Sequence, residues 1–258
     1  MMADSTFLAR GCWRAAQVSV QVVASTYAPS PEQIRDIDRV WVDACARPGV
    51  NLFDGPLCRL ESHSSDHAHL HLSVSQCSYK QFYGTNGTHS QWADTHGWAC
   101  LANAVGTSAA LVSGDGWLVF GRRAESLALY PGWAHPFGGI LEPSDDIDLL
   151  NEMQRELHEE IGLAATDLSD LACIGLVRDP HLMQPELLYV ARTPLSLATL
   201  EQRLDAGEHS ACWCVRADPS AIAVALHHEF LTPVTRLVLQ RFAEILELEQ
   251  ATETGNPA

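Results

Sequence analysis

The pattern of apolar and polar positions divides this chain into short strands and a few helices with one apolar face. Strands are predicted at residues 18–23, 57–60, 67–74, 109–112, 117–121, 172–177, 187–191 and 211–215. Helices are predicted at residues 31–44, 78–82, 91–97, 149–161, 197–204 and 230–248, and a loop at residues 83–87. Strands interspersed with a few helices favour an α/β or α+β fold, with a mixed sheet sandwiched between helices.

The apolar pattern changes near residues 100–106. Two apolar strands follow that point, joined by a Gly114-Asp115-Gly116 turn, which is typical of a hairpin. We therefore expect an N-terminal α+β extension over residues 1–103, packed on a second domain over residues 104–250. Residues 251–258 are polar and are expected to form a flexible tail.

Composition narrows the classes of partner. The 258 residues carry a formal net charge of −16, which argues against general binding to nucleic acid or to an anionic membrane. No apolar stretch approaches the length of a membrane span, and the N-terminus lacks the apolar core of a secretory signal. The eight cysteines form no Cys-x-x-Cys pair, which favours reduced thiols and a cytoplasmic protein. Both a monomer and a homodimer are compatible with this composition.

The most informative chemistry lies in the segment that contains Glu156, Glu159 and Glu160. These glutamates are three, four and one residues apart, so on a helix they share one face. Carboxylates this close repel one another unless a cation lies between them. Mg²⁺ prefers oxygen ligands and commonly bridges substrate phosphates, and Mn²⁺ is a second candidate. The segment therefore predicts a metal site, although an acidic helix face can also be simply solvated.

The helix around these glutamates has clear sequence signals. Gly162 follows the last apolar position, where a helix commonly ends in a left-handed residue. Oxygens for the N-cap are offered by Ser144, Asp145 and Asp146. The apolar positions at helical spacing are Leu149, Leu150, Met153, Leu157 and Ile161.

The flanking residues make a merely solvated acidic face a poor explanation. Arg155 lies four residues before Glu159 and is expected to pair with it. Upstream, Pro136-Phe137-Gly138-Gly139 forms a loop with little side-chain bulk, which lets a backbone carbonyl approach a metal. All seven specified positions of the ending Arg-Glu-apolar-any-Glu-Glu-any-Gly-apolar are present from Arg155 to Leu163. The segment thus resembles the signature of the Nudix hydrolases.

The first half of that signature departs from the family pattern. Eight residues before Arg155, where the signature has a glutamate, this chain has Ile147 between Asp146 and Asp148. The stretch from Gly139 to Arg155 is also longer than usual. The departure concerns the start of the helix and the early acid, and the three glutamates are untouched by it.

The first half of the chain narrows the resemblance to one branch of that family, the UDP-glucose/UDP-galactose diphosphatases, which carry an N-terminal extension. The resemblance runs from Pro31 to the last helix, and its motifs occur in the same order. They are Glu32-Gln33-Ile34, Leu52-Phe53-Asp54-Gly55-Pro56 with Arg59-Leu60, Ser78-Tyr79-Lys80-Gln81-Phe82 with Gly84-Thr85-Asn86, Ala104-Val105-Gly106-Thr107-Ser108-Ala109-Ala110-Leu111, and Val119-Phe120 with Arg122-Arg123.

The branch implies a Mg²⁺-dependent reaction that converts a UDP-hexose to UMP and a hexose 1-phosphate. By this resemblance Glu156 and Glu160 are metal ligands, and Glu159 is a third ligand or the partner of Arg155. The Gly139 carbonyl completes the shell. The resemblance also supports Glu186 as a distal ligand, in keeping with its position after Pro185 at the start of an apolar strand. Glu208 is the second choice for that role.

Further residues are expected to bind the substrate. Arg122 and Arg123 end an apolar strand, where they could grip a pyrophosphate or simply be solvated. The resemblance places Phe53, Asp54, Tyr83 and Asn86 near the uridine or the sugar. Two other functions stay open on the sequence. One is a Nudix pyrophosphatase for another nucleoside diphosphate derivative, such as ADP-ribose, and the other is a nucleotide-sugar sensor without catalysis.

Overall fold

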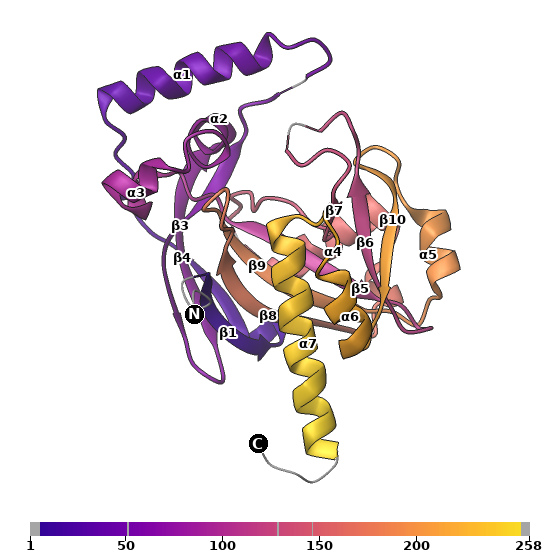
Figure 1. Cartoon of the computed structure of the whole chain (residues 1–258). Helices are drawn as coiled ribbons and strands as arrows, with labels where there is room; N and C mark the ends of the chain where they lie inside the picture. Colours follow the sequence, from indigo (N-terminus) through magenta and orange to yellow (C-terminus); the bar gives the residue numbers. More distant parts are fainter. Residues whose placement is uncertain (1–5, 51, 128, 146, 254–258) are drawn as a thin grey trace. The chain divides into compact units, whose positions relative to one another are not determined.

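The computed structural model describes residues 6–50, 52–127, 129–145 and 147–253 (Figure 1). The chain forms two compact units. The first unit contains residues 1–107, 139–152 and 176–187, and the second contains residues 108–138, 153–175 and 188–258. The predicted division at residues 103 and 104 stays a prediction. Part of the predicted tail, residues 254–258, lies outside the described residues, and the last helix includes residues up to Glu253.

The first unit contains a sheet of three strands, ordered β2-β4-β3. Here β2 (Val18–Val22) runs parallel to β4 (Leu70–Ser78), and β3 (Pro56–Ser65) runs antiparallel to β4. Strand β1 (Phe7–Trp13) was not expected from the sequence, because Arg10 and Gly11 interrupt its apolar alternation. All three strands of the sheet were expected, although their bounds differ from the predicted residues 18–23, 57–60 and 67–74.

Two helices of the first unit begin at side-chain caps. Ser30 and Gln33 form a capping box at the start of α1 (Pro31–Cys45), and Ser78 and Gln81 do the same for α2 (Tyr79–Phe82). The unit also includes α3 (Trp92–His96) and two 3₁₀ turns, η1 (Ala15–Gln17) and η3 (Trp98–Cys100).

The predicted loop at residues 83–87 is instead a π-helical turn, η2 (Tyr83–Gly87). Gly84 explains the difference, because a Cβ at this position would lie 2.8 Å from Cγ2 of Ile37. The missing side chain lets the turn pack closely against α1. A glycine that the sequence marks as a loop residue is therefore a packing residue here.

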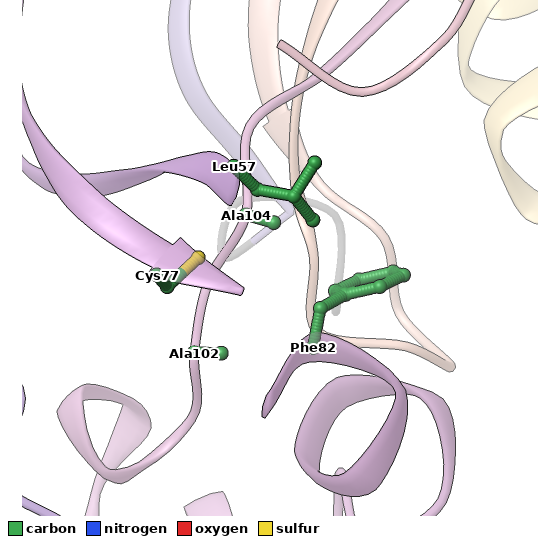
Figure 2. Close-up of a cluster of buried hydrophobic side chains, with 5 residues drawn as sticks. All are labelled: Leu57, Cys77, Phe82, Ala102 and Ala104. Atoms are coloured by element: carbon green, nitrogen blue, oxygen red, sulfur yellow. The ribbon is translucent and has the colours of Figure 1, made fainter. Parts of the chain in front are cut away.

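An apolar cluster joins several elements of the first unit (Figure 2). Leu57 comes from β3, Cys77 from β4 and Phe82 from α2, and they meet Ala102 and Ala104 of the following segment. All five residues are buried. The cluster fixes α2 and the turn after it against the sheet.

The second unit is built on a larger sheet. The strands of this sheet are ordered β1-β8-β9-β5-β6-β10, and β7 (Ala134–His135) pairs with β6 (Trp117–Arg123). Strands β5 (Gly106–Val112), β8 (Asp170–Arg178) and β9 (Pro185–Arg192) each contain residues of both units. Strand β10 (His209–Arg216) runs antiparallel to β6, as β5 does. The predicted hairpin of β5 and β6 is confirmed.

Helices and a 3₁₀ turn complete the second unit. They are α4 (Leu149–Ile161), η4 (Ala165–Asp167), α5 (Leu197–Arg203), α6 (Pro219–Ala225) and α7 (Pro233–Glu253), with the first four residues of α4 in the first unit. Helix α6, which the sequence did not reveal, contacts both β10 and α7. The mixture of sheets and helices confirms the predicted α/β class. In the part of the chain that is described, no helix is both long and apolar enough to cross a membrane.

Candidate functional site

Helix α4 positions the glutamates because its apolar side is anchored in the core. Leu149, Met153, Leu157 and Ile161 are almost fully buried, which confirms these four positions of the predicted apolar stripe, whereas Leu150 is only partly buried. The cap differs from expectation, since it is Asp148 whose Oδ1 accepts hydrogen bonds from the amides of Leu150 (2.9 Å) and Asn151 (3.1 Å). Asp146, one of the expected caps, lies outside the described residues.

The C-terminal end of α4 is fixed as the sequence predicted. Gly162 has a φ of +63°, which is the left-handed region where glycine is favoured. The amide of Leu163 donates to the carbonyl of Leu157 at 3.2 Å, and the amide of Gly162 to that of His158 at 3.0 Å. This closure resembles a Schellman motif, with Leu163 buried after the turn. The glutamates therefore lie on the last two turns of a helix with a defined end.

The three glutamates differ in exposure. The side chain of Glu156 is 14% exposed and that of Glu160 is 6% exposed, whereas that of Glu159 is 55% exposed. Arg155 forms ion pairs with two of the three glutamates, with Nη2 at 2.6 Å from Oε1 of Glu156 and Nη1 at 2.7 Å from Oε2 of Glu159. The predicted Arg155–Glu159 pair is confirmed. The same guanidinium group also orients Glu156.

Each carboxylate oxygen of Glu160 lies near a nitrogen atom. The amide of Gly138 donates to Oε2 at 2.8 Å, so the loop before α4 does reach the glutamates. Nε2 of His209, at the start of β10, lies 3.4 Å from Oε1. His209 was not expected from the sequence, because nothing in its local pattern links it to a helix some fifty residues earlier.

Burial disfavours the negatively charged forms of Glu156 and Glu160. Burial is the main cause that raises the pKa of Glu156 to about 7. The positive charge of Arg155 lowers this pKa and only partly offsets burial, while the negative charges of Glu160 and Glu159 raise it further. Burial also raises the pKa of Glu160, against the contacts with His209 and Gly138, and the charge of Glu208 adds to the rise. Two partly desolvated carboxylates on adjacent turns would be stabilised by a cation, and their oxygen donors suit Mg²⁺.

The described residues include no group of three or more His, Cys, Asp or Glu side chains arranged to hold a metal ion. The reason lies in the different surroundings of the glutamates, because Arg155 holds Glu159 at the exposed side and Glu160 faces Gly138 and His209. Glu156 and Glu160 are thus the pair whose chemistry fits a metal ion, and Glu159 lies beside them.

The other predicted ligands belong to the first unit. The Gly139 carbonyl accepts a hydrogen bond of 2.8 Å from the amide of Thr107. Glu186 is buried at the start of β9 beside Gly106, where a Cβ would lie 2.6 Å from its Oε2. Gly139 and Glu186 therefore both lie at the beginning of β5. Their role as ligands stays a prediction.

The two arginines expected to bind substrate leave β6 differently. Arg122 is exposed, while Nε of Arg123 donates to the Leu129 carbonyl at 2.9 Å. Consecutive residues of a strand point to opposite faces of the sheet. Arg122 and Arg123 thus extend from opposite faces of β6, and their substrate-binding role stays a prediction.

The residues expected near the uridine or the sugar lie in the first unit. Phe53 is 81% exposed, and Oδ1 of Asp54 accepts a hydrogen bond from the Lys80 amide at 2.8 Å. Tyr83 and Asn86 are buried, and the Asn86 amide group donates to the Leu182 carbonyl at 3.0 Å. Of these four side chains, Phe53 is the most available to a ligand, and the substrate-binding role of all four stays a prediction.

Comparison with known proteins finds the family that the segment from Arg155 to Leu163 resembles. A model described as "NUDIX domain" matches residues 102–236, a little over half of the chain. A protein of Mus musculus named "Uridine diphosphate glucose pyrophosphatase NUDT22" is 31% identical over 193 residues, or 62% of this chain and 61% of that protein. Its Homo sapiens counterpart is 31% identical over 160 residues, or 50% of this chain and 52% of that protein. This chain thus spans less than two thirds of either relative.

Among solved structures, a MutT protein from Methanosarcina mazei Go1 is 21% identical and covers 56% of this chain and 95% of its own, with a TM-score of 0.43. A likeness at that TM-score adds no argument. The assignment of the chain to a family rests on the NUDIX model, whose match contains β5, β6, α4 and the three glutamates. On this match, the chain belongs to the NUDIX domain family.

Proposed function

We propose that this protein hydrolyses the pyrophosphate bond of UDP-sugars, such as UDP-glucose and UDP-galactose, to UMP and a hexose 1-phosphate. The observation that carries the proposal is the pair of largely buried carboxylates, Glu156 and Glu160, oriented by Arg155 and Gly138 in a NUDIX domain. The choice of substrate draws support from the two relatives named as UDP-glucose pyrophosphatases.

Glu156 and Glu160 would hold Mg²⁺, with Glu159 beside them and with Gly139 and Glu186 as further predicted ligands. Mn²⁺ offers the same oxygen preference and can replace it. When bound, the ion supplies positive charge against the pyrophosphate oxygens and makes a bound water more acidic.

The chain itself contributes orientation and a proton acceptor. Arg155 keeps the carboxylates of Glu156 and Glu159 turned toward one side of α4. The amide of Gly138 holds Glu160 in one orientation, so little side-chain freedom is lost when substrate binds. One carboxylate of this patch accepts a proton from the attacking water as the water oxygen bonds to one phosphorus. The bond from that phosphorus to the bridging oxygen breaks, and the other phosphate departs, so that UMP and hexose 1-phosphate are released.

We also propose that residues 104–250 form the hydrolytic domain and that residues 1–103 help to select the nucleoside or the sugar. Phe53 is the side chain of that extension with the largest exposed aromatic surface available for stacking. The substitution Phe53→Ala should then raise the KM for UDP-glucose and leave kcat nearly unchanged. An unchanged KM would remove Phe53 from substrate recognition.

A substrate panel tests the proposal. Purified protein with Mg²⁺ is offered UDP-glucose, UDP-galactose, ADP-ribose and a dinucleoside polyphosphate, and the products are separated by chromatography. Release of UMP and hexose 1-phosphate from the UDP-sugars is expected. Turnover of ADP-ribose without turnover of UDP-sugars would overturn the substrate choice, and tight binding of UDP-glucose without hydrolysis would favour a sensor.

A further inference from the structure

His209 is a buried imidazole that the hydrolytic scheme above does not use. Its side chain is 1% exposed, and among the described residues neither ring nitrogen has a hydrogen-bond partner of good geometry. Polar groups buried to this extent are normally paired, so an unpaired ring requires an explanation. The nearest acidic atom is Oε1 of Glu160, at 3.4 Å from Nε2.

The surrounding backbone and side chains fix the position of the ring. A Cβ at Gly121 of β6 would lie 2.2 Å from Nδ1 of His209, so the imidazole lies directly against the glycine backbone. The ring of Phe137 meets it edge-on, with centroids 5.3 Å apart and an interplanar angle of 85°. The register of β6 and β10 shifts between His209 and Ala211, and this irregularity sets His209 apart from the regular ladder.

This packing brings Nε2 to within 3.4 Å of Oε1 of the Glu160 carboxylate. Glu160 is then approached from two sides, by the Gly138 amide at Oε2 and by the imidazole at Oε1. A buried histidine often serves only to fill space, but an apolar ring would fill this space without leaving two nitrogens unpaired. The short distance from Nε2 to Oε1 therefore points to a role for the ring nitrogen itself.

We propose that His209 is a positioning residue for Glu160, whose carboxylate it holds through Nε2–H so that the remaining lone pairs face the metal. Outer groups that orient a metal ligand in this way commonly change metal affinity about 10- to 100-fold when they are removed. The proposal rests on the proposed function, because it takes Glu160 to be a ligand of Mg²⁺ or Mn²⁺.

The test compares His209→Gln with His209→Asn. Glutamine can place an amide N–H close to the position of Nε2, whereas asparagine is too short to reach it. Mn²⁺ affinity is measured without substrate by electron paramagnetic resonance of the free ion, and UDP-glucose hydrolysis is measured across Mg²⁺ concentrations. We expect His209→Asn to weaken Mn²⁺ binding about 10- to 100-fold and His209→Gln to retain most of the affinity.

A matched control comes from another histidine. His63 in β3 is partly buried, and its Nδ1 also has no hydrogen-bond partner among the described residues. It belongs to the first unit and is not part of the proposed metal site. His63→Asn should leave Mn²⁺ affinity at the wild-type value. A loss equal to that of His209→Asn would show a general structural effect and overturn the proposal.

Gly121→Ala gives an independent test, because its methyl group would displace the imidazole without changing any polar group. It should weaken Mn²⁺ binding in the same way as His209→Asn. Wild-type affinity in both His209 variants, or an equal loss in both, overturns the positioning role even if the wild type hydrolyses UDP-glucose. A wild type that binds Mn²⁺ but leaves UDP-sugars intact instead refutes only the proposed substrate.

Discussion

Glu61 lies in a dense polar network of the first unit, and its replacement by glutamine should remove a large share of stability. The carboxylate, at the bulge of β3, accepts hydrogen bonds from Ser75 Oγ (2.5 Å), the Thr26 amide (3.1 Å) and Arg59 Nε (3.0 Å). Arg59 is itself buried and also donates to the carbonyls of Leu101 and Ala99. Glu61 therefore neutralises a buried guanidinium group.

The magnitude follows from the pKa of Glu61. Burial alone would raise it, but the hydrogen bonds from Ser75 and Thr26 and the charge of Arg59 outweigh burial and lower it from 4.5 to about 2. At about 1.36 kcal/mol for each tenfold change in proton affinity, the difference is worth about 3 kcal/mol. The native pKa is depressed, so this stability is complete above the unfolded value and is lost as the pH falls toward 2.

Urea unfolding at several pH values measures the effect. At pH 7, Glu61→Gln should lower the free energy of unfolding by about 3 kcal/mol relative to wild type. At pH 3 the difference should shrink to about 1.4 kcal/mol, and near pH 2 it should almost vanish. As a control, Asp36→Asn disrupts the exposed pair with Arg39 and should change stability by less than about 1 kcal/mol. Parallel pH curves for wild type and Glu61→Gln would refute the reasoning.

Further predictions concern α4. The raised pKa of Glu156 means that the metal-free protein should lose stability as the pH rises from 4.5 to about 7, so Glu156→Gln should stabilise it at pH 8 by up to about 3 kcal/mol in urea unfolding. A destabilised variant would contradict this. Asp148→Ala removes the cap and should lower the Tm by about 2–4 °C in calorimetry, and an unchanged Tm would dismiss Asp148 as the cap. Met153→Ala should lower the free energy of unfolding, measured in urea, by about 2–5 kcal/mol. A decrease below about 1 kcal/mol would mean that the apolar stripe of α4 is poorly packed.

Helix α4 and its glutamates could be predicted because their signals are local. The apolar stripe, the stop at Gly162 and the Arg155–Glu159 pair all depend on residues within one helix, and the structure contains each of them. The cap was harder to place, since several acidic residues precede the helix. The hydrogen bonds to the amides of Leu150 and Asn151 identify Asp148 as the cap. Asp148 directly follows Ile147, the position at which the chain departs from the family signature.

The features that escaped prediction depend on contacts distant in sequence. Gly84 was expected in a loop, yet its contact with Ile37 makes it part of a packed π-helical turn. Strand β7 has two residues and carries no periodicity. His209 lies beside Glu160 only because β6 and β10 pair and bring its ring against Gly121. Such contacts leave no pattern in a single sequence.

The central claim is that Glu160 belongs to a metal-dependent site that cleaves UDP-sugars, and steady-state kinetics with UDP-glucose and Mg²⁺ test it most directly. Three proteins are compared: wild type, Glu160→Gln, and His158→Gln, which changes an exposed residue of the same helix. Wild type and His158→Gln should release UMP and glucose 1-phosphate at similar rates, while Glu160→Gln should lose at least about 100-fold in kcat with its thermal stability intact. Full activity of Glu160→Gln would contradict the account.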